Sequence, residues 1–213
     1  MALGCGLGET LQESRVDGHK LRGGHLSRDD AESLEDAAQK IERLPILIDD
    51  RASQSMENIH SIARRTQDKQ GLALVVIDYL QRMGGRRTRG TSRTEELEDF
   101  SRRAKQIAKE LKVNVVLVSQ LSRAPDHRPK HRPVMSDLRE SGGIEQEADH
   151  VWLLYRPGYY KDVKVDESGA PVGDRAELEV GKCRNGPTGT VRLTWNGKSM
   201  TFDNYFKDQE MPF

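Results

Sequence analysis

The chain has 213 residues with 34 basic and 34 acidic side chains, so its formal charge is zero and no overall field attracts DNA or acidic partners. Any contact with nucleic acid must therefore come from local basic patches. The 2 cysteines exclude a disulfide framework, and no apolar run approaches the ~20 residues that a membrane span needs. With no signal-peptide pattern at its start, the sequence predicts a soluble, cytoplasmic, single domain with no membrane partner.

The first stretch, residues 1–13, gives the weakest pattern. Its glycines alternate with other residues from Gly4 to Gly8, as in a loop, but no Gly-Lys-Ser/Thr follows as in a phosphate-binding loop. We therefore expect a frayed, poorly defined N-terminal segment.

Alternating helices and strands are predicted next. Ser27 and Asp30 form a helix start, and apolar residues at helical spacing predict a helix near 28–43. The run 46–50 predicts a short buried strand that ends in acids, and 54–68 predicts another amphipathic helix. Strand and helix segments that alternate in this way are typical of a parallel sheet with crossover helices.

The central stretch is the apolar run Leu72–Asp78, which ends at a carboxylate. It predicts a strand buried on both faces of a parallel sheet, because no polar face alternates with the apolar one. An acid at the carboxyl edge of such a sheet can order the water shell of a nucleotide-bound Mg²⁺, which is the Walker B pattern. A second strand, 113–119, leads to Gln120. The alternative for Asp78 is a solvated acid at a strand end.

The segment 82–93 is rich in arginine, glycine and hydroxyl residues and includes Arg86, Arg87 and Arg89. Such a cationic loop suits a phosphate backbone, because each contact releases counterions. The alternative is a solvated loop without a ligand. Apolar residues at helical spacing then predict a strong helix over 94–111.

The stretch 121–135 carries several prolines and cannot hold a long helix. His127 and His131 have the spacing of two metal ligands on a helix, but the prolines deny them that helix. No Glu or Cys completes a set of ligands, so we predict no zinc site there.

The last third is predicted to be mostly antiparallel. After a strand at 150–155 and a polar surface excursion at 157–174, two Asn-Gly pairs signal hairpins between three alternating strands, at 176–180, 190–195 and 199–203. Strand alternation places Lys182 and Arg184 on one face, with Cys183 on the other. Taken alone, these two cations could be solubilising charges on an edge strand.

Five motifs carry a family resemblance: Asp-Tyr-Leu-Gln at 78–81, Ser-Gln-Leu at 119–121, Ser-Asp-Leu-Arg-Glu-Ser-Gly at 136–142, Lys-Cys-Arg-Asn-Gly-Pro at 182–187 and Phe-Asp-Asn-Tyr at 202–205. In this order they resemble the C-terminal motor domain of bacterial replicative hexameric helicases of the DnaB type. The resemblance covers 14–205 and leaves 206–213 as a tail. It implies an α/β fold, a partial RecA-like sheet with crossover helices, mainly parallel and ending in antiparallel hairpins.

The resemblance also implies roles for individual residues. Asp78 would order the Mg²⁺ shell, and Gln120 would sense the γ-phosphate of ATP. Lys182 and Arg184 would reach into the site of a neighbouring subunit, Arg184 as an arginine finger. Single-stranded DNA would be gripped by Arg139, Glu140 and Gly142, and contacted in the central channel by Arg86, Arg87 and Arg89.

The sequence departs from the family pattern because it holds no Gly-x-x-x-x-Gly-Lys-Ser/Thr P-loop. The strand that supplies the catalytic Glu in the family is also missing, so we expect the chain to begin after both. It should not hydrolyse ATP unaided, and ATP and Mg²⁺ should bind only with a complementing P-loop segment or a neighbouring subunit.

We expect the chain to be the distal part of an ATP-dependent 5′–3′ replicative DNA helicase. Complete relatives form hexameric rings on single-stranded DNA, and the primosome proteins, primase and helicase loader, are further candidate partners. The alternative is a non-catalytic fragment that binds single-stranded DNA or the helicase and caps or inhibits intact hexamers. A third possibility is a decayed gene with no selected role.

Overall fold

A computed structural model describes residues 5–51, 54–83, 92–166, 169 and 171–205. The chain divides into two compact units, each built from separate stretches. The first comprises Met1–Asp50, Tyr155–Leu178 and Val191–Phe213, and the second comprises Arg51–Leu154 and Glu179–Thr190. The second unit carries most of the predicted functional residues.

Two long helices of the second unit match their predicted positions. Helix α4 spans Met56–Gln70 and helix α5 spans Arg93–Leu111. Each begins at a serine whose side chain accepts a hydrogen bond from a backbone N–H of the first turn, Ser55 for α4 and Ser92 for α5. At α5 the Glu95 carboxylate also accepts from the Ser92 backbone N–H at 2.7 Å, which completes a capping box.

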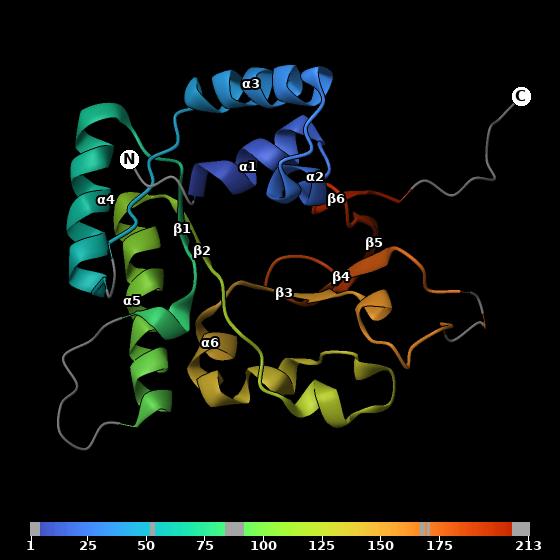
Figure 1. Ribbon diagram of the computed structural model, residues 1–213. Helices are drawn as coiled ribbons and strands as arrows, with labels where there is room; N and C mark the ends of the chain where they lie inside the picture. Colours follow the sequence, from blue (N-terminus) through green and yellow to red (C-terminus); the bar gives the residue numbers. More distant parts are fainter. Residues whose placement is uncertain (1–4, 52–53, 84–91, 167–168, 170, 206–213) are drawn as a thin grey trace, which may run out of the picture. The chain divides into compact units, whose positions relative to one another are not determined.

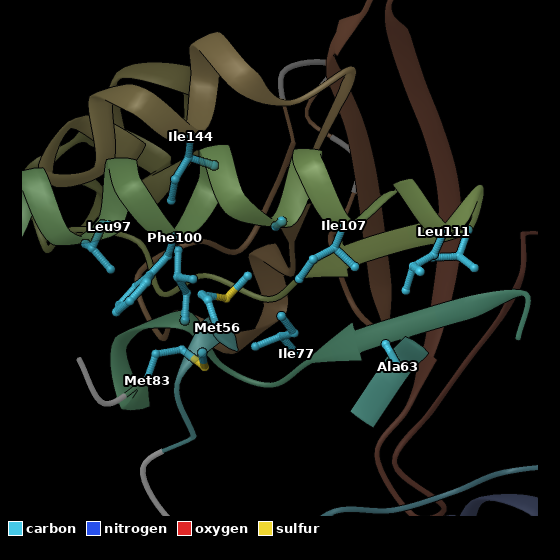
Figure 2. Packing of buried hydrophobic residues seen from close by; sticks show 12 residues of the cluster. Met56, Ala63, Ile77, Met83, Leu97, Phe100, Ile107, Leu111 and Ile144 are labelled. Atoms are coloured by element: carbon cyan, nitrogen blue, oxygen red, sulfur yellow. The ribbon is translucent and has the colours of Figure 1, made fainter. Parts of the chain in front are cut away.

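The main hydrophobic core lies between these helices and a small sheet. Figure 2 shows Leu97, Phe100, Ile107 and Leu111 projecting from one side of α5 toward Met56 and Ile77. Leu97 and Met56 are each only 2% exposed, because the apolar stripes of α5 and α4 meet there. This cluster also takes in residues beyond the helices, namely Ile77, Leu80, Met83, Val113 and Ile144.

The sheet of this unit consists of β1 (Leu74–Ile77) and β2 (Asn114–Leu117). The strands are parallel and in register, with Leu74 opposite Asn114 and Ile77 opposite Leu117, and Figure 1 shows them side by side. The parallel pairing is as predicted, but the expected burial on both faces is wrong. Leu74 and Val76 are 49% and 56% exposed, because α4 and α5 both cover the Val75/Ile77 face.

Between β2 and the second sheet, the chain forms short turns. The turns are η2 (Ala124–His127), η3 (Pro129–His131) and η4 (Met135–Ser141), followed by α6 (Gly142–Glu147). No long helix forms in the described 121–135 stretch, as the prolines predict.

The first unit corrects two expectations. Instead of a frayed terminus, Cys5–Ser14 forms helix α1, whose Leu11 is 7% exposed and which packs against α3 (Arg28–Glu42). A loop was predicted from glycine spacing alone, and tertiary packing outweighs that local preference. The predicted strand at 46–50 is absent, and Ile48 is 56% exposed, because among the described residues no neighbouring strand pairs with this run.

Helix α3 itself lies where the sequence places it. Ser27 accepts from the Asp30 backbone N–H, and the Asp30 carboxylate accepts from the Ser27 backbone N–H, so the predicted helix start is a full capping box. A short helix α2 (Gly18–Gly23) precedes it, with Asp17 as its N-cap.

A second sheet has the strand order β3-β4-β5-β6. Its strands are β3 (His150–Tyr155), β4 (Arg175–Cys183), β5 (Gly189–Asn196) and β6 (Thr201–Asn204). Strands β5 and β6 are antiparallel, and Asn196 Oδ1 accepts from the Lys198 backbone N–H at 3.1 Å in the turn between them. The predicted C-terminal hairpin is therefore confirmed.

The stretch 157–174 after β3 was predicted to lie on the surface, but some of its residues are buried. It begins with η5 (Pro157–Tyr159), and its Val163 and Val172 are buried. None of the described helices has the length and apolar character that crossing a bilayer requires.

Candidate functional site

Asp78 and Gln120 follow neighbouring parallel strands and lie at the same edge of the sheet. The Val118 backbone N–H donates to the Ile77 carbonyl at 3.0 Å, and the Leu80 N–H donates to the Val118 carbonyl at 2.9 Å. The pairing thus continues past the ends of β1 and β2. Asp78 and Gln120 are both exposed at this carboxyl edge, the position where α/β sheets bind ligands.

Gln81 connects the two strand ends. Its side-chain Nε2 donates to Ser119 Oγ and to the Gln120 carbonyl, both at 3.1 Å, and its Oε1 accepts from the Gln120 backbone N–H at 3.1 Å. Arg93 Nη2 in turn donates to the Gln81 carbonyl at 2.7 Å. Sequence reasoning assigned no role to Gln81. Its place as the last residue of the Asp-Tyr-Leu-Gln motif at 78–81 was the available signal.

Lys182 and Arg184 contact one short stretch of chain, as their predicted common face requires. Lys182 Nζ donates to the Glu145 and Gln146 carbonyls, at 2.5 Å and 3.2 Å, near the C-terminal end of α6. Arg184 Nη1 lies 3.1 Å from Asp149 Oδ1, and the Arg184 backbone N–H donates to the Asp149 carbonyl at 2.9 Å. Both cations therefore have partners within their own chain.

Asp149 lies between two cations. Lys105 from α5 pairs with the same carboxylate, and this hydrogen bond is the main reason that the pKa of Asp149 is held below its ordinary value. Burial acts in the opposite direction, and the charge of Arg184 lowers the pKa further. The Arg184 side chain remains 56% exposed, so it is open to solvent on one side.

The segment predicted to grip DNA comprises the end of η4 and the start of α6. Arg139 and Glu140 lie in η4, and Gly142 is the first residue of α6. The contacts of these three side chains are outside what the structure describes. The structure therefore places the backbone of the predicted segment in the second unit, directly before Gly143 and Ile144.

Asp137, in the same segment, was missed as a key residue. It is 2% exposed, and its carboxylate accepts two hydrogen bonds from Arg128, from Nη1 at 2.6 Å and from Nη2 at 2.5 Å. The hydrogen bond with Arg128 is the main reason that the pKa of Asp137 lies below its ordinary value. In the sequence analysis this aspartate appeared only as a member of the Ser-Asp-Leu-Arg-Glu-Ser-Gly motif at 136–142, without a role of its own.

Glycine allows α6 to approach α5 closely. A Cβ on Gly143 would lie 2.9 Å from the Cα of Glu98 and closer still to its side chain. The next residue, Ile144, is buried in the main core cluster with Phe100 and Leu97 (Figure 2). The start of α6 is thus fixed against α5 directly after the predicted DNA segment.

The arginines predicted for a second DNA contact, Arg86, Arg87 and Arg89, lie outside the described residues. Of the two histidines that were considered as metal ligands, His131 has its Nδ1 3.1 Å from the Pro125 carbonyl oxygen. Within the described part of the chain, no three His, Cys, Asp or Glu side chains gather as metal ligands would.

Comparisons with known proteins agree with the resemblance that the motifs indicate. The model of the DnaB-like helicase C terminal domain family matches residues 9–204. A replicative DNA helicase DnaB from Mycobacterium leprae (strain TN) is 42% identical over 181 residues, which cover 85% of this chain and 29% of that protein. The chain spans less than half the length of such curated relatives, 42% in the case of a probable replicative DNA helicase from Trieres chinensis.

Solved structures share the fold. One of them, an ATPase domain, superposes with a TM-score of 0.84 at 35% identity, covering 93% of this chain and 69% of that one. A DnaB-like replicative helicase, described together with its interactions with primase, gives a TM-score of 0.86 at 34% identity, covering 97% and 49%. The expected RecA-like α/β fold, with a parallel and an antiparallel part, is confirmed by these neighbours.

Proposed function

Because the chain belongs to the DnaB-like helicase C-terminal domain family, we propose that it works as part of an ATP-driven replicative DNA helicase. The observation that carries this proposal is the common sheet edge of Asp78 and Gln120, which follow the carboxyl ends of the parallel strands β1 and β2. Such an edge suits a nucleotide. Asp78 orders the water shell of a Mg²⁺ on the phosphates, and Gln120 senses the γ-phosphate.

The second half of each nucleotide site is supplied by a neighbouring copy. In our proposal Lys182 and Arg184 reach across to neutralise charge on the transferred phosphoryl group, Arg184 as the finger. The half-exposed Arg184 is suited to this movement, because Asp149 keeps Lys105 as a partner when Arg184 leaves. This arrangement requires a closed ring of identical chains, a hexamer as in complete family members.

The DNA contact in this proposal lies at the end of η4 and the start of α6. Arg139 and the backbone around Gly142 hold phosphates of single-stranded DNA without reading bases, and Glu140 orients Arg139. Arg86, Arg87 and Arg89 add cationic contacts. Primase and a helicase loader are the further partners that we propose, and primase is supported by a structural neighbour that is described with its primase interactions.

The nucleotide site must be completed by residues outside this sequence. The 213 residues hold no Gly-x-x-x-x-Gly-Lys-Ser/Thr, so they offer no cradle for the β- and γ-phosphates. We therefore propose that ATP and Mg²⁺ bind productively only when a P-loop-bearing segment complements the chain. In this proposal the chain does not turn over ATP alone.

ATP hydrolysis tests the proposal. The chain is assayed alone and with a P-loop-bearing segment of a family member, with single-stranded DNA present. We expect turnover only in the mixture, and Asp78→Asn should abolish it, whereas Asp68→Asn, at an exposed acid on α4, should not. A mixture without turnover that instead inhibits an intact hexameric helicase would contradict the motor and support the capping fragment.

A further inference from the structure

We propose that the Arg128–Asp137 ion pair is a positioning device that fixes the segment 135–142 to the end of strand β2. The inference rests on the proposed function for one point only, that this segment contacts DNA. The structural part of the inference rests on the described contacts of Arg128, Asp137, Ser122 and Val134.

The ion pair is strong by geometry and burial. The guanidinium of Arg128 donates to both carboxylate oxygens of Asp137, at 2.6 Å and 2.5 Å. The side chain of Asp137 is 1% exposed and that of Arg128 is 33% exposed, so water competes little for the carboxylate. Bidentate pairs of this kind fix orientation as well as distance.

Asp137 joins three stretches of chain. Besides Arg128, its Oδ2 accepts from the Val134 backbone N–H at 2.7 Å. Its own carbonyl accepts from the Ser122 backbone N–H at 3.1 Å, and Ser122 follows closely after Gln120. One buried residue therefore connects η4 both to the proline-rich stretch and to the continuation of β2.

The far end of the segment is fixed independently. Gly143 lies against the backbone of Glu98, and Ile144 is 7% exposed in the main core. The proposed DNA-contacting stretch, Arg139–Gly142, is thus bracketed by Asp137 on one side and by the α5 contact on the other. Fixed ends hold its backbone amides in place for phosphates and tie their position to the β2 end that carries Gln120.

A surface ion pair would not have this effect. Arg15 and Asp203 show the same bidentate geometry, at 2.8 Å and 2.7 Å, but their side chains are 53% and 36% exposed. Exposed pairs contribute little, because water solvates both partners when they separate. The Asp137 side chain is instead 1% exposed, so water has little access to take the place of the charge that Asp137→Asn removes from the pair. Asp203→Asn is therefore a matched control for Asp137→Asn.

Amide hydrogen exchange on the full chain tests the positioning without DNA. In Asp137→Asn we expect the Val134 and Ser122 amides to exchange roughly tenfold to hundredfold faster. The Val134 amide loses a carboxylate acceptor, and the acceptor of Ser122 is the Asp137 backbone carbonyl, which the ion pair with Arg128 holds in place. Amides in the middle of α5 should change little, and Asp203→Asn should leave all of these amides unchanged. Arg128→Lys keeps the charge but loses the bidentate geometry. It should therefore accelerate exchange of the same two amides by a smaller factor.

Unchanged exchange at Ser122 and Val134 in Asp137→Asn overturns the inference. Acceleration spread evenly over α5 also overturns it, because that pattern shows general destabilisation instead of local positioning. If Asp137→Asn does not fold, unchanged exchange of the Ser122 and Val134 amides in Arg128→Lys overturns the inference instead.

Binding of a fluorescently labelled oligothymidine separates the inference from the proposed function. If the wild-type chain binds it, we expect Asp137→Asn to bind roughly tenfold more weakly and Asp203→Asn to bind as the wild type does. Equal binding by Asp137→Asn overturns the inference and leaves the proposed function standing. If the wild-type chain binds no oligothymidine, the DNA contact of the proposed function fails, and the exchange experiment still decides the positioning.

Discussion

Replacing Gly143 by alanine tests the close approach of α6 to α5. An added Cβ would lie 2.7 Å from Cβ of Glu98 and 2.9 Å from its Cα, and closer still to its Cγ. The end of the glutamate side chain can rotate away, but the Cα can move only with the α5 backbone. Because α5 contributes several buried side chains to the main core, among them Leu97 and Phe100, its backbone cannot shift without disturbing that packing.

Two effects of opposite sign determine the stability of Gly143→Ala. Alanine in a helix gains about 0.5–1 kcal/mol over glycine, whereas overpacking a close-packed contact costs about 1–3 kcal/mol. We therefore expect a net loss of about 1–2 kcal/mol. Gly8→Ala is the matched control, because Gly8 lies in helix α1 and a Cβ there would meet nothing within 4 Å. It should gain about 0.5–1 kcal/mol.

Urea unfolding followed by far-ultraviolet circular dichroism measures both variants against the wild type. The expected signs are opposite, a lower midpoint for Gly143→Ala and a higher one for Gly8→Ala. A Gly143→Ala chain that is as stable as the wild type would refute the close contact of α6 with α5. The control shows in the same assay what glycine-to-alanine does without a clash.

Three further predictions concern packing, capping and pH. Leu97→Ala, at a buried position of α5, should lower the unfolding free energy by about 2–5 kcal/mol. Leu74→Ala, on the exposed face of β1, should lower it much less. Equal losses in denaturant titrations would contradict the one-sided burial of β1. Ser92→Ala removes the cap of α5 and should cost about 0.5–2 kcal/mol in the same titration; an unchanged midpoint would contradict the capping box. Hydrogen bonds from Lys20 and from Ser27 lower the pKa of Asp30 to about 2 from its ordinary 3.8. The stability from Asp30 is therefore present above pH 3.8 and lost as the pH falls toward 2; a carboxyl NMR titration reports the midpoint directly, and one near 3.8 would contradict the contacts.

The helices and the C-terminal hairpin could be predicted from the sequence because their signals are local. Spaced apolar residues locate α3, α4 and α5, the Ser27 start signal adds to the evidence for α3, and an Asn-Gly pair locates the turn before β6. The run 46–50 shows the limit of such signals. Its composition suits a strand, but a strand forms only where another backbone pairs with it, and composition carries no information about that partner.

The candidate site likewise has features that could be predicted from the sequence and features that could not. The adjacency of Asp78 and Gln120 follows from two apolar strands that must be parallel, so their carboxyl ends share an edge. The hydrogen bonds of Gln81 and the Arg128–Asp137 pair could not be predicted, because they join irregular stretches in which no periodicity fixes the direction of a side chain. One-sided burial of β1 likewise depends on which faces α4 and α5 cover, which an unbroken apolar run does not reveal.

Mixing two inactive variants tests most directly whether neighbouring copies share one nucleotide site. With a complementing P-loop segment present, Asp78→Asn and Arg184→Ala chains should each show no ATP turnover alone, because one lacks the proposed magnesium acid and the other the proposed arginine finger. An equimolar mixture should regain turnover, since an intact Asp78 of one copy then meets an intact Arg184 of the next. A mixture as inactive as its components, or full activity of Arg184→Ala alone, would contradict a site shared between copies.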